Sequence, residues 1–198
     1  MKITSATFLT SSTDVKSCPE TPWPEIALIG RSNVGKSSLL NLLCGQEKLA
    51  KISGTPGHTK LINFFVMNEA WCLVDLPGYG FTKTKPSERA DFERMIADYL
   101  TRREQLACVL VLIDSRHSPQ LIDLEFVEWL AKHRVRIALV FTKVDKLKPA
   151  AVAANIAAFH KIIAPMFAES LPTFSCSTVT RAGWRELLGF LGSVLTEA

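Results

Sequence analysis

The sequence predicts a three-layer α/β fold whose central sheet is doubly wound, mostly parallel and bordered by one antiparallel edge pair. Short apolar runs alternate with amphipathic helical patterns along the whole chain, which is typical of right-handed βαβ units. Two strand-like runs are separated only by Asn68, Glu69 and Ala70, and this spacing predicts a hairpin. The length of 198 residues is that of one domain.

The predicted strands are short runs rich in apolar residues. The run at 106–113 is apolar at every position, which indicates a strand buried on both faces. The run at 26–29 ends at Gly30, and residues 11–24 are expected to form a loop. In chain order, we expect strands at residues 3–9, 26–29, 61–67, 71–74, 106–113, 136–141 and 171–174.

The predicted helices show apolar residues at a helical spacing. Phe92, Met95, Ile96, Tyr99 and Leu100 fall on one face of a helix that starts near residue 86. The remaining helices are expected at residues 37–44, 121–127, 150–163 and 184–195. We expect residues 1–24 to be a strand and connecting loop packed on a single domain at 25–198.

Composition excludes several classes of protein. The longest apolar run, residues 106–113, is far shorter than the roughly 20 residues of a membrane span. The first residues are too polar for the core of a signal peptide. Five scattered cysteines without a C-x-x-C pair argue against a disulfide framework or a zinc site and favour a reducing compartment. We therefore expect a cytoplasmic protein that does not contact the membrane.

The strongest motif is a phosphate-binding loop between a predicted strand and a predicted helix. Its pattern is G-x-x-x-x-G-K-S, in which backbone N–H groups surround phosphate oxygens. Lys36 is expected to reach the β- and γ-phosphates, and the Ser37 hydroxyl to ligate Mg²⁺. The predicted contacts are Gly30, Arg31, Ser32, Asn33, Val34, Gly35, Lys36, Ser37 and the following Ser38.

Three later segments indicate that the nucleotide carries guanine. The segment Asp75, Leu76, Pro77 and Gly78 matches D-x-x-G: its carboxylate would hold Mg²⁺ through water, and the N–H of its glycine could sense a γ-phosphate. Thr142, Lys143 and Asp145 match T-K-x-D, whose carboxylate can accept two hydrogen bonds from guanine. Ser175, Cys176 and Ser177 follow the last strand and suit a backbone contact to guanine O6. All three segments follow strands, where doubly wound sheets bind ligands.

Together these motifs resemble the EngB/YihA (YsxC) type of bacterial ribosome-biogenesis GTPase, of the TrmE-Era-EngA-YihA-Septin-like P-loop superfamily. The resemblance rests on GRSNVGKSSLLN, TPGHT at 55–59, DLPGYG at 75–80, DSRH at 114–117 and TKVD. It implies a P-loop GTPase fold, binding of GTP and GDP with Mg²⁺, and slow GTP hydrolysis. It also implies association with the large ribosomal subunit, its rRNA and proteins, and a link to cell division and septation. We expect a monomer.

The resemblance also places a switch I threonine at Thr59, beside Gly57 and His58. A hydroxyl from a mobile loop can complete the Mg²⁺ shell only when a γ-phosphate is present. The loop at 46–60 is therefore expected to be an order–disorder switch. The predicted metal ligands are Ser37, Thr59 and Asp75.

Hydrolysis is expected to be slow. Ras-like enzymes orient the attacking water with a Gln near D-x-x-G, but this chain has Tyr79 and Gly80 there. We expect Lys36, Asn33 and Thr59 to act in catalysis. In related GTPases an Asn at the position of Asn33 helps coordinate K⁺; its alternative role is to stabilise the turn of the loop.

Other interpretations stay open at this stage. Six of the residues between 132 and 148 are basic and form either a solvated surface or a patch for RNA. The chain could bind GTP with negligible turnover. A metabolite kinase, with Arg102 and Arg103 in a lid, leaves the D-x-x-G and T-K-x-D segments unexplained.

Overall fold

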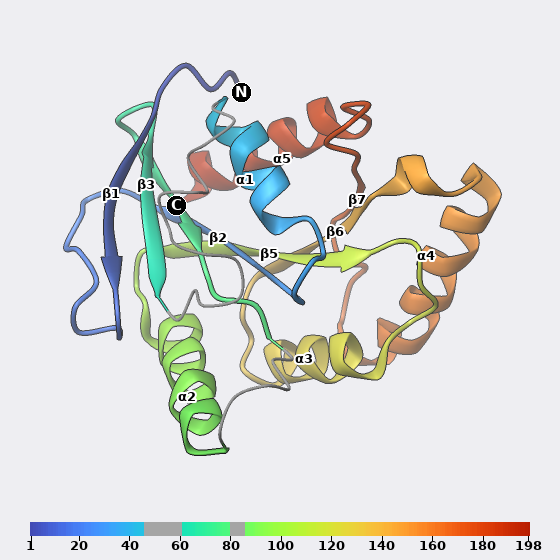
Figure 1. Ribbon diagram of the computed structural model, residues 1–198, viewed down its shortest axis with the longest axis horizontal. Helices are drawn as coiled ribbons and strands as arrows, with labels where there is room; N and C mark the ends of the chain where they lie inside the picture. Colours follow the sequence, from blue (N-terminus) through green and yellow to red (C-terminus); the bar gives the residue numbers. More distant parts are fainter. Residues whose placement is uncertain (46–60, 80–85) are drawn as a thin grey trace.

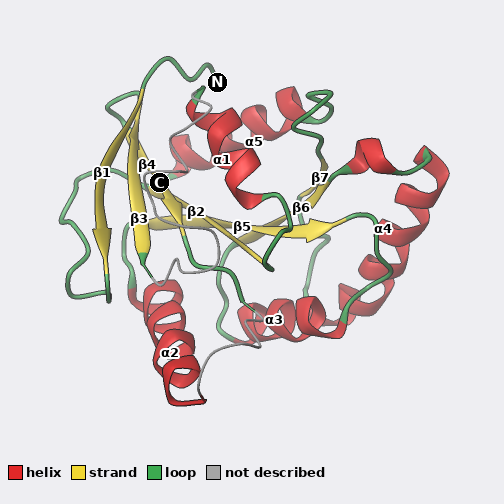
Figure 2. Ribbon diagram, viewed as in Figure 1, coloured by secondary structure: helices red, strands yellow, loops and turns green. Residues whose placement is uncertain are grey.

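The computed structural model describes residues 1–45, 61–79 and 86–198. Seven strands form one sheet in the order β1-β3-β4-β2-β5-β6-β7. Helices cover both faces of this sheet, so the fold has three layers (Figure 1, Figure 2). The strands are β1 (Ala6–Ser12), β2 (Glu25–Gly30), β3 (Ile62–Met67), β4 (Trp71–Asp75), β5 (Leu106–Asp114), β6 (Ile137–Thr142) and β7 (Thr173–Ser175).

Most of the sheet is parallel. β4, β2, β5, β6 and β7 pair in parallel, whereas β3 is antiparallel to both of its neighbours, β1 and β4. The predicted hairpin is the connection between β3 and β4, and the parallel strands all end at the same edge of the sheet. The predicted fold class is confirmed.

Two apolar cores lie on opposite faces of the sheet. Leu40 of α1 and Leu191 of α5 belong to one core, and Tyr99 of α2, Val127 of α3 and Phe159 of α4 belong to the other. Successive strand residues point to opposite faces, so the buried strands supply both cores. The helices are α1 (Lys36–Cys44), α2 (Pro86–Arg102), α3 (Leu121–Lys132), α4 (Pro149–Ile163) and α5 (Trp184–Glu197), with 3₁₀ turns η2 (Val144–Lys146) and η3 (Ala164–Met166).

The positions of the helices agree with the apolar spacing in the sequence. The predicted face of α2 is buried at Met95, Ile96, Tyr99 and Leu100, whereas the side chain of Phe92 lies outside the described residues. None of the helices within the described ranges combines the length and the apolar character that a membrane crossing requires.

The first strand lies three residues later in the chain than the sequence predicts. Strand β1 is Ala6–Ser12 and not 3–9, so Ser11 and Ser12 belong to a strand and not to the expected loop. The cause is Asn68, which begins the turn after β3. Its side-chain oxygen accepts hydrogen bonds from the N–H groups of Thr4 and Ser5, at 2.7 and 3.2 Å. Pairing with β3 therefore begins only at Ala6, opposite the last residue of β3.

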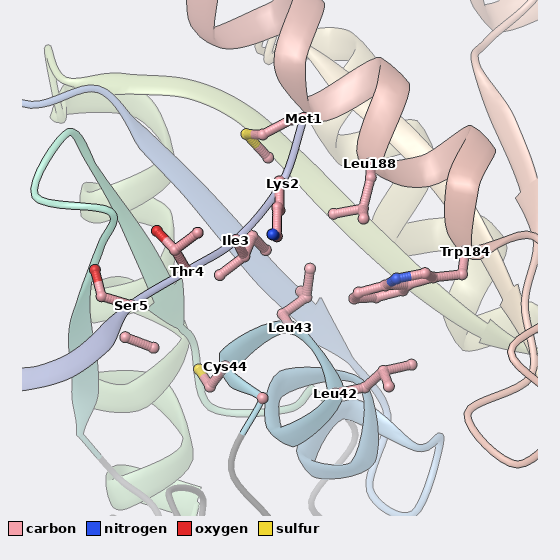
Figure 3. A pocket seen from close by; sticks show the side chains of 12 residues that line it. Met1, Lys2, Ile3, Thr4, Ser5, Leu42, Leu43, Cys44, Trp184 and Leu188 are labelled. Atoms are coloured by element: carbon pink, nitrogen blue, oxygen red, sulfur yellow. The ribbon is translucent and has the colours of Figure 1, made fainter.

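The residues before β1 cross the face that carries α1 and α5. Ile3 packs against this core together with Trp184 and Leu188 of α5. A pocket lies between this N-terminal segment, α5 and the end of α1 at Leu43 and Cys44 (Figure 3). The residues that line this pocket are separate from the predicted nucleotide contacts.

A buried ion pair fixes the end of α2 to the start of β2. Glu25 is fully buried and accepts a hydrogen bond from the Tyr99 hydroxyl at 2.7 Å. Arg103 donates to both oxygens of this carboxylate and to the carbonyl of Pro19, at 2.6 Å. The Arg103 side chain is 8% exposed, so it is a structural group and does not belong to the lid that a kinase would need.

Replacing Arg103 with Ala should therefore destabilise the protein strongly. The substitution leaves the Glu25 carboxylate buried without its counterion, which costs about 3–5 kcal/mol of unfolding free energy. Urea denaturation measures the effect. Arg102→Ala is the matched control: that side chain is 73% exposed and pairs with Asp98 on its own helix, so its loss should change stability by less than about 1 kcal/mol. Equal effects of the two substitutions would contradict this account.

Candidate nucleotide-binding site

The structure brings the predicted motifs together at the carboxyl edge of the parallel strands. The phosphate-binding loop follows β2, the D-x-x-G segment follows β4, T-K-x-D lies at the end of β6, and the Ser175 segment lies at the end of β7. β4 lies beside β2 and β6 beside β7, with β5 between the two pairs, so four segments that are far apart in the sequence converge at one edge of the sheet. This is the edge at which open α/β sheets bind ligands.

The phosphate-binding loop has the backbone shape that its sequence predicts. Asn33 and Gly35 have positive φ angles of 62° and 107°, and α1 begins directly afterwards at Lys36. The N-cap residue of α1 is Gly35, which has no side chain to bond the first N–H groups of the helix, so these groups can bind an anion. Val34 is buried and anchors the loop, whereas Ser32, Asn33, Ser37 and Ser38 are exposed.

Two glycines allow the D-x-x-G segment to lie directly against the phosphate-binding loop. A Cβ atom on Gly78 would lie 2.5 Å from the carbonyl oxygen of Gly30. A Cβ atom on Gly30 would in turn lie 2.8 Å from the carbonyl oxygen of Leu112 in β5. Any larger residue at either position would force the backbone segments apart.

The predicted phosphate and magnesium residues are in contact. The ammonium group of Lys36 forms a hydrogen-bonded ion pair with Asp75, whose side chain is 7% exposed. Ser37 lies in the next position of α1. A hydroxyl and a carboxylate are the hard oxygen ligands that Mg²⁺ prefers, so the residues present fit this ion. Thr59, Gly57, His58 and Gly80 lie outside the described residues, as does the predicted switch at 46–60.

Lys143 connects the base-reading segment to the phosphate-binding loop. Its ammonium group donates to the carbonyl oxygen of Asn33 and to Asp114 Oδ2 at 2.8 Å. The preceding Thr142 hydroxyl donates to the Val34 carbonyl at 2.6 Å. Although burial raises the pKa of Asp114, hydrogen bonds from Arg116 and Lys143 hold it well below its usual value. The ionised Asp114 therefore fixes the lysine, a role that sequence reasoning missed although Asp114 directly follows a predicted strand.

Asp145 is held by Ser177 of the neighbouring segment. The Ser177 hydroxyl donates to Asp145 Oδ1 at 2.6 Å, and this hydrogen bond, with one from Lys146, lowers the pKa of Asp145. The carboxylate is therefore ionised near neutral pH and can accept hydrogen bonds. Because it bonds Asp145, the hydroxyl of Ser177 has a positioning role that its sequence context did not indicate.

The backbone N–H groups of this segment have partners within the protein. The N–H of Cys176 donates to the carbonyl oxygen of Phe141 at 2.7 Å, and the N–H of Ser177 donates to that of Ala182 at 3.2 Å.

Tyr79 points toward α3. Its hydroxyl donates to Asp123 Oδ1 at 2.8 Å, and its ring stacks on Phe126 with centroids 4.3 Å apart. The side chain directly after D-x-x-G is therefore occupied by contacts with a helix.

Comparisons with known proteins identify the family. Residues 25–143 match the family described as 50S ribosome-binding GTPase. The chain is 47% identical over 197 residues to a probable GTP-binding protein EngB of Bacteroides fragilis, covering 100% of this chain and 98% of the relative. A protein of the same name from Porphyromonas gingivalis is 46% identical with the same coverage. This chain belongs to the EngB family of GTP-binding proteins.

The EngB fold is also present among solved structures. The crystal structure of a probable GTP-binding protein engB aligns with 88% of this chain and 100% of that chain, with a TM-score of 0.68 and 21% identity. At this identity the likeness concerns the fold. The predicted EngB resemblance and the GTPase class are thus confirmed, and membership of this family supports binding of GTP and GDP. It removes the support for a metabolite kinase.

Proposed function

We propose that this chain is a slow GTP-hydrolysing switch that acts in the cytoplasm, as a monomer, in assembly of the large ribosomal subunit. The observation that carries the proposal is the hydrogen-bonded connection of Lys143 to the phosphate-binding loop, beside an Asp145 carboxylate that Ser177 holds. A nucleotide bound by both segments is recognised at its phosphates and its base at once. From the same family resemblance we include a link to cell division and septation in the proposal.

In the proposed arrangement each segment has one task. The backbone N–H groups of residues 30–38 and the Lys36 ammonium bind the phosphates. Asp145 accepts hydrogen bonds from the N1–H and amino groups of guanine, and the Lys143 stem lies along the base. Ser37, Thr59 and Asp75 would hold Mg²⁺, which would offset the phosphate charge. The N–H of Gly78 donates to the γ-phosphate.

The contacts of Tyr79 support slow hydrolysis. Because its hydroxyl is bonded to Asp123, the residue after D-x-x-G is directed toward α3 and is not available to orient the attacking water. The same observation favours a second candidate function, a GTP-gated binding module with negligible turnover. The left-handed φ of Asn33 supports its role in the loop turn, a conformation that Asn tolerates. Coordination of K⁺ by Asn33 stays a prediction.

The family description supports the ribosomal partner, and the structure divides the basic stretch at 132–148. Lys132 pairs with Glu128 and Arg136 pairs with Glu197, both at 2.7 Å and on exposed surface. Lys143 and Lys146 belong to the nucleotide site. Arg134 and Lys148 are also exposed, Arg134 before the start of β6 and Lys148 after its end. We propose that an RNA contact uses these exposed groups together with Lys132.

Asp145→Asn should change the preferred base. The amide places an N–H donor where guanine requires an acceptor, so GTP affinity should fall at least about tenfold, while affinity for xanthosine triphosphate should rise. Fluorescence titration with both nucleotides measures this. Lys146→Ala is the control, because Lys146 contacts Asp145 without reading the base, and it should keep the preference for GTP. Unchanged GTP affinity in Asp145→Asn would refute the base-reading role.

Binding to separated ribosomal subunits should depend on the nucleotide. We expect co-sedimentation with large subunits to be stronger with a non-hydrolysable GTP analogue than with GDP. Reversing Lys132, Arg134 and Lys148 to Glu should weaken binding and flatten its salt dependence, since fewer cations are released from the RNA. Equal binding of large subunits in the presence of GDP and of the GTP analogue would contradict the switch. Equal binding by the charge-reversed and unmodified chains would place the interface elsewhere.

Single-turnover hydrolysis separates the two candidate functions. We expect slow GTP cleavage by the protein alone, faster cleavage in K⁺ than in Na⁺, and a change when large subunits are added. No cleavage under any of these conditions would favour the binding module. Equal rates in the two salts would remove the potassium role of Asn33.

A further inference from the structure

A buried carboxylate of α3 joins the two segments expected to surround the γ-phosphate. Asp123 lies in the first turn of α3, and its side chain is 1% exposed. Its Oδ1 atom accepts the hydrogen bond from the Tyr79 hydroxyl at 2.8 Å and lies 3.2 Å from Nε of Arg31. Arg31 belongs to the phosphate-binding loop and Tyr79 to the segment after D-x-x-G. Three parts of the chain therefore meet at one oxygen atom.

The energetics of this cluster indicate a role other than stability. The second oxygen of Asp123, Oδ2, is buried and has no hydrogen-bond partner among the residues that the structure describes. Burial also raises the pKa of the Asp123 carboxyl, although Tyr79 and Arg31 oppose this effect. An apolar residue would avoid both penalties, because buried ion pairs with unsatisfied atoms contribute little to folding. The cluster is therefore better explained by a role in positioning its neighbours than by a contribution to the stability of the fold.

Tyr79 and Arg31 each follow a glycine of the nucleotide site, and these glycines are what the cluster would position. Tyr79 directly follows Gly78, and Arg31 directly follows Gly30. These two glycines make the closest approach between the D-x-x-G segment and the phosphate-binding loop. A side chain held by α3 restricts the backbone of the residue before it, so Asp123 controls the direction of the Gly78 N–H.

We propose that Asp123 is a positioning residue that, through Tyr79 and Arg31, aligns the D-x-x-G segment with the phosphate-binding loop and so raises the affinity for GTP relative to that for GDP. This inference rests on the proposed role of the Gly78 N–H as a sensor of the γ-phosphate. GDP has no γ-phosphate, so the affinity of the chain for GDP does not depend on the Gly78 N–H. The alignment by Asp123 should therefore change the affinity for GTP more than the affinity for GDP.

The chain contains a matched control for a purely structural hydrogen bond. Tyr99 donates to the buried carboxylate of Glu25 at 2.7 Å, and Arg103 pairs with that same carboxylate. This second cluster of tyrosine, carboxylate and arginine lies at the start of β2, at the opposite edge of the sheet from the nucleotide site. Removing either tyrosine hydroxyl deletes the same kind of bond, but only one bond lies next to Gly78.

The experiment compares Tyr79→Phe with Tyr99→Phe in the full chain. Affinities for GDP and for a non-hydrolysable GTP analogue are measured by titration, and stability is measured in urea. We expect Tyr79→Phe to weaken binding of the analogue about five- to tenfold while GDP affinity changes less than twofold. Tyr99→Phe should leave the ratio of the two affinities as in the unmodified chain.

A double-mutant cycle assigns the effect to Asp123. Asp123→Ala should shift the affinity ratio in the same direction, and adding Tyr79→Phe to it should cause no further shift. If Asp123→Ala does not fold, the comparison of the two tyrosine variants decides alone.

The possible failures are distinguishable. An unchanged ratio in Tyr79→Phe, or an equal loss of affinity for both nucleotides, would overturn the positioning role and leave the proposed function intact. Failure of the unmodified chain to bind either nucleotide would overturn both.

Discussion

The nucleotide site depends on the close packing of three backbone segments around the end of β2. Gly30 lies against the carbonyl of Leu112 in β5, and Gly78 lies against the carbonyl of Gly30. The absence of side chains at both glycines lets the phosphate-binding loop, the D-x-x-G segment and β5 pack without a gap. This packing brings Lys36 to Asp75 and places Arg31 and Tyr79 within reach of one carboxylate.

Two similar clusters lie at opposite edges of the sheet and serve different purposes. Glu25 accepts hydrogen bonds from Tyr99 and Arg103 at both of its oxygens, which fixes the end of α2 to β2. Within the described residues, Asp123 shares one oxygen between two partners, and its other oxygen has no hydrogen-bond partner. The complete cluster fixes two elements to each other. The incomplete one lies at the edge of the proposed nucleotide switch, and lower local stability is required of such an element.

Side chains connect the nucleotide-site segments to the helices and to one another. Tyr79, near the position where Ras-like enzymes orient water, is hydrogen-bonded to α3, so the D-x-x-G segment is joined to that helix. Lys143, which is paired with Asp114, joins the T-K-x-D segment to the phosphate-binding loop.

The sequence by itself determined the strands, the helices and the nucleotide motifs, because apolar periodicity and glycine-rich loops act over a few neighbouring residues. It placed Lys36 between a strand and a helix, and Asp75 and Asp145 shortly after strands. In the structure Lys36 begins α1, Asp75 ends β4 and Asp145 follows β6. Only the tertiary structure decided the shift of β1, the hydrogen bond of Ser177 to Asp145, and the contacts of Asp114 and Asp123. These depend on which strands and helices are neighbours in space: Thr142 and Val34 are 108 residues apart in the chain, yet share a hydrogen bond. Periodicity shows which face a residue takes, but the partner on that face is set by the order of strands in the sheet and by the packing of the helices against them.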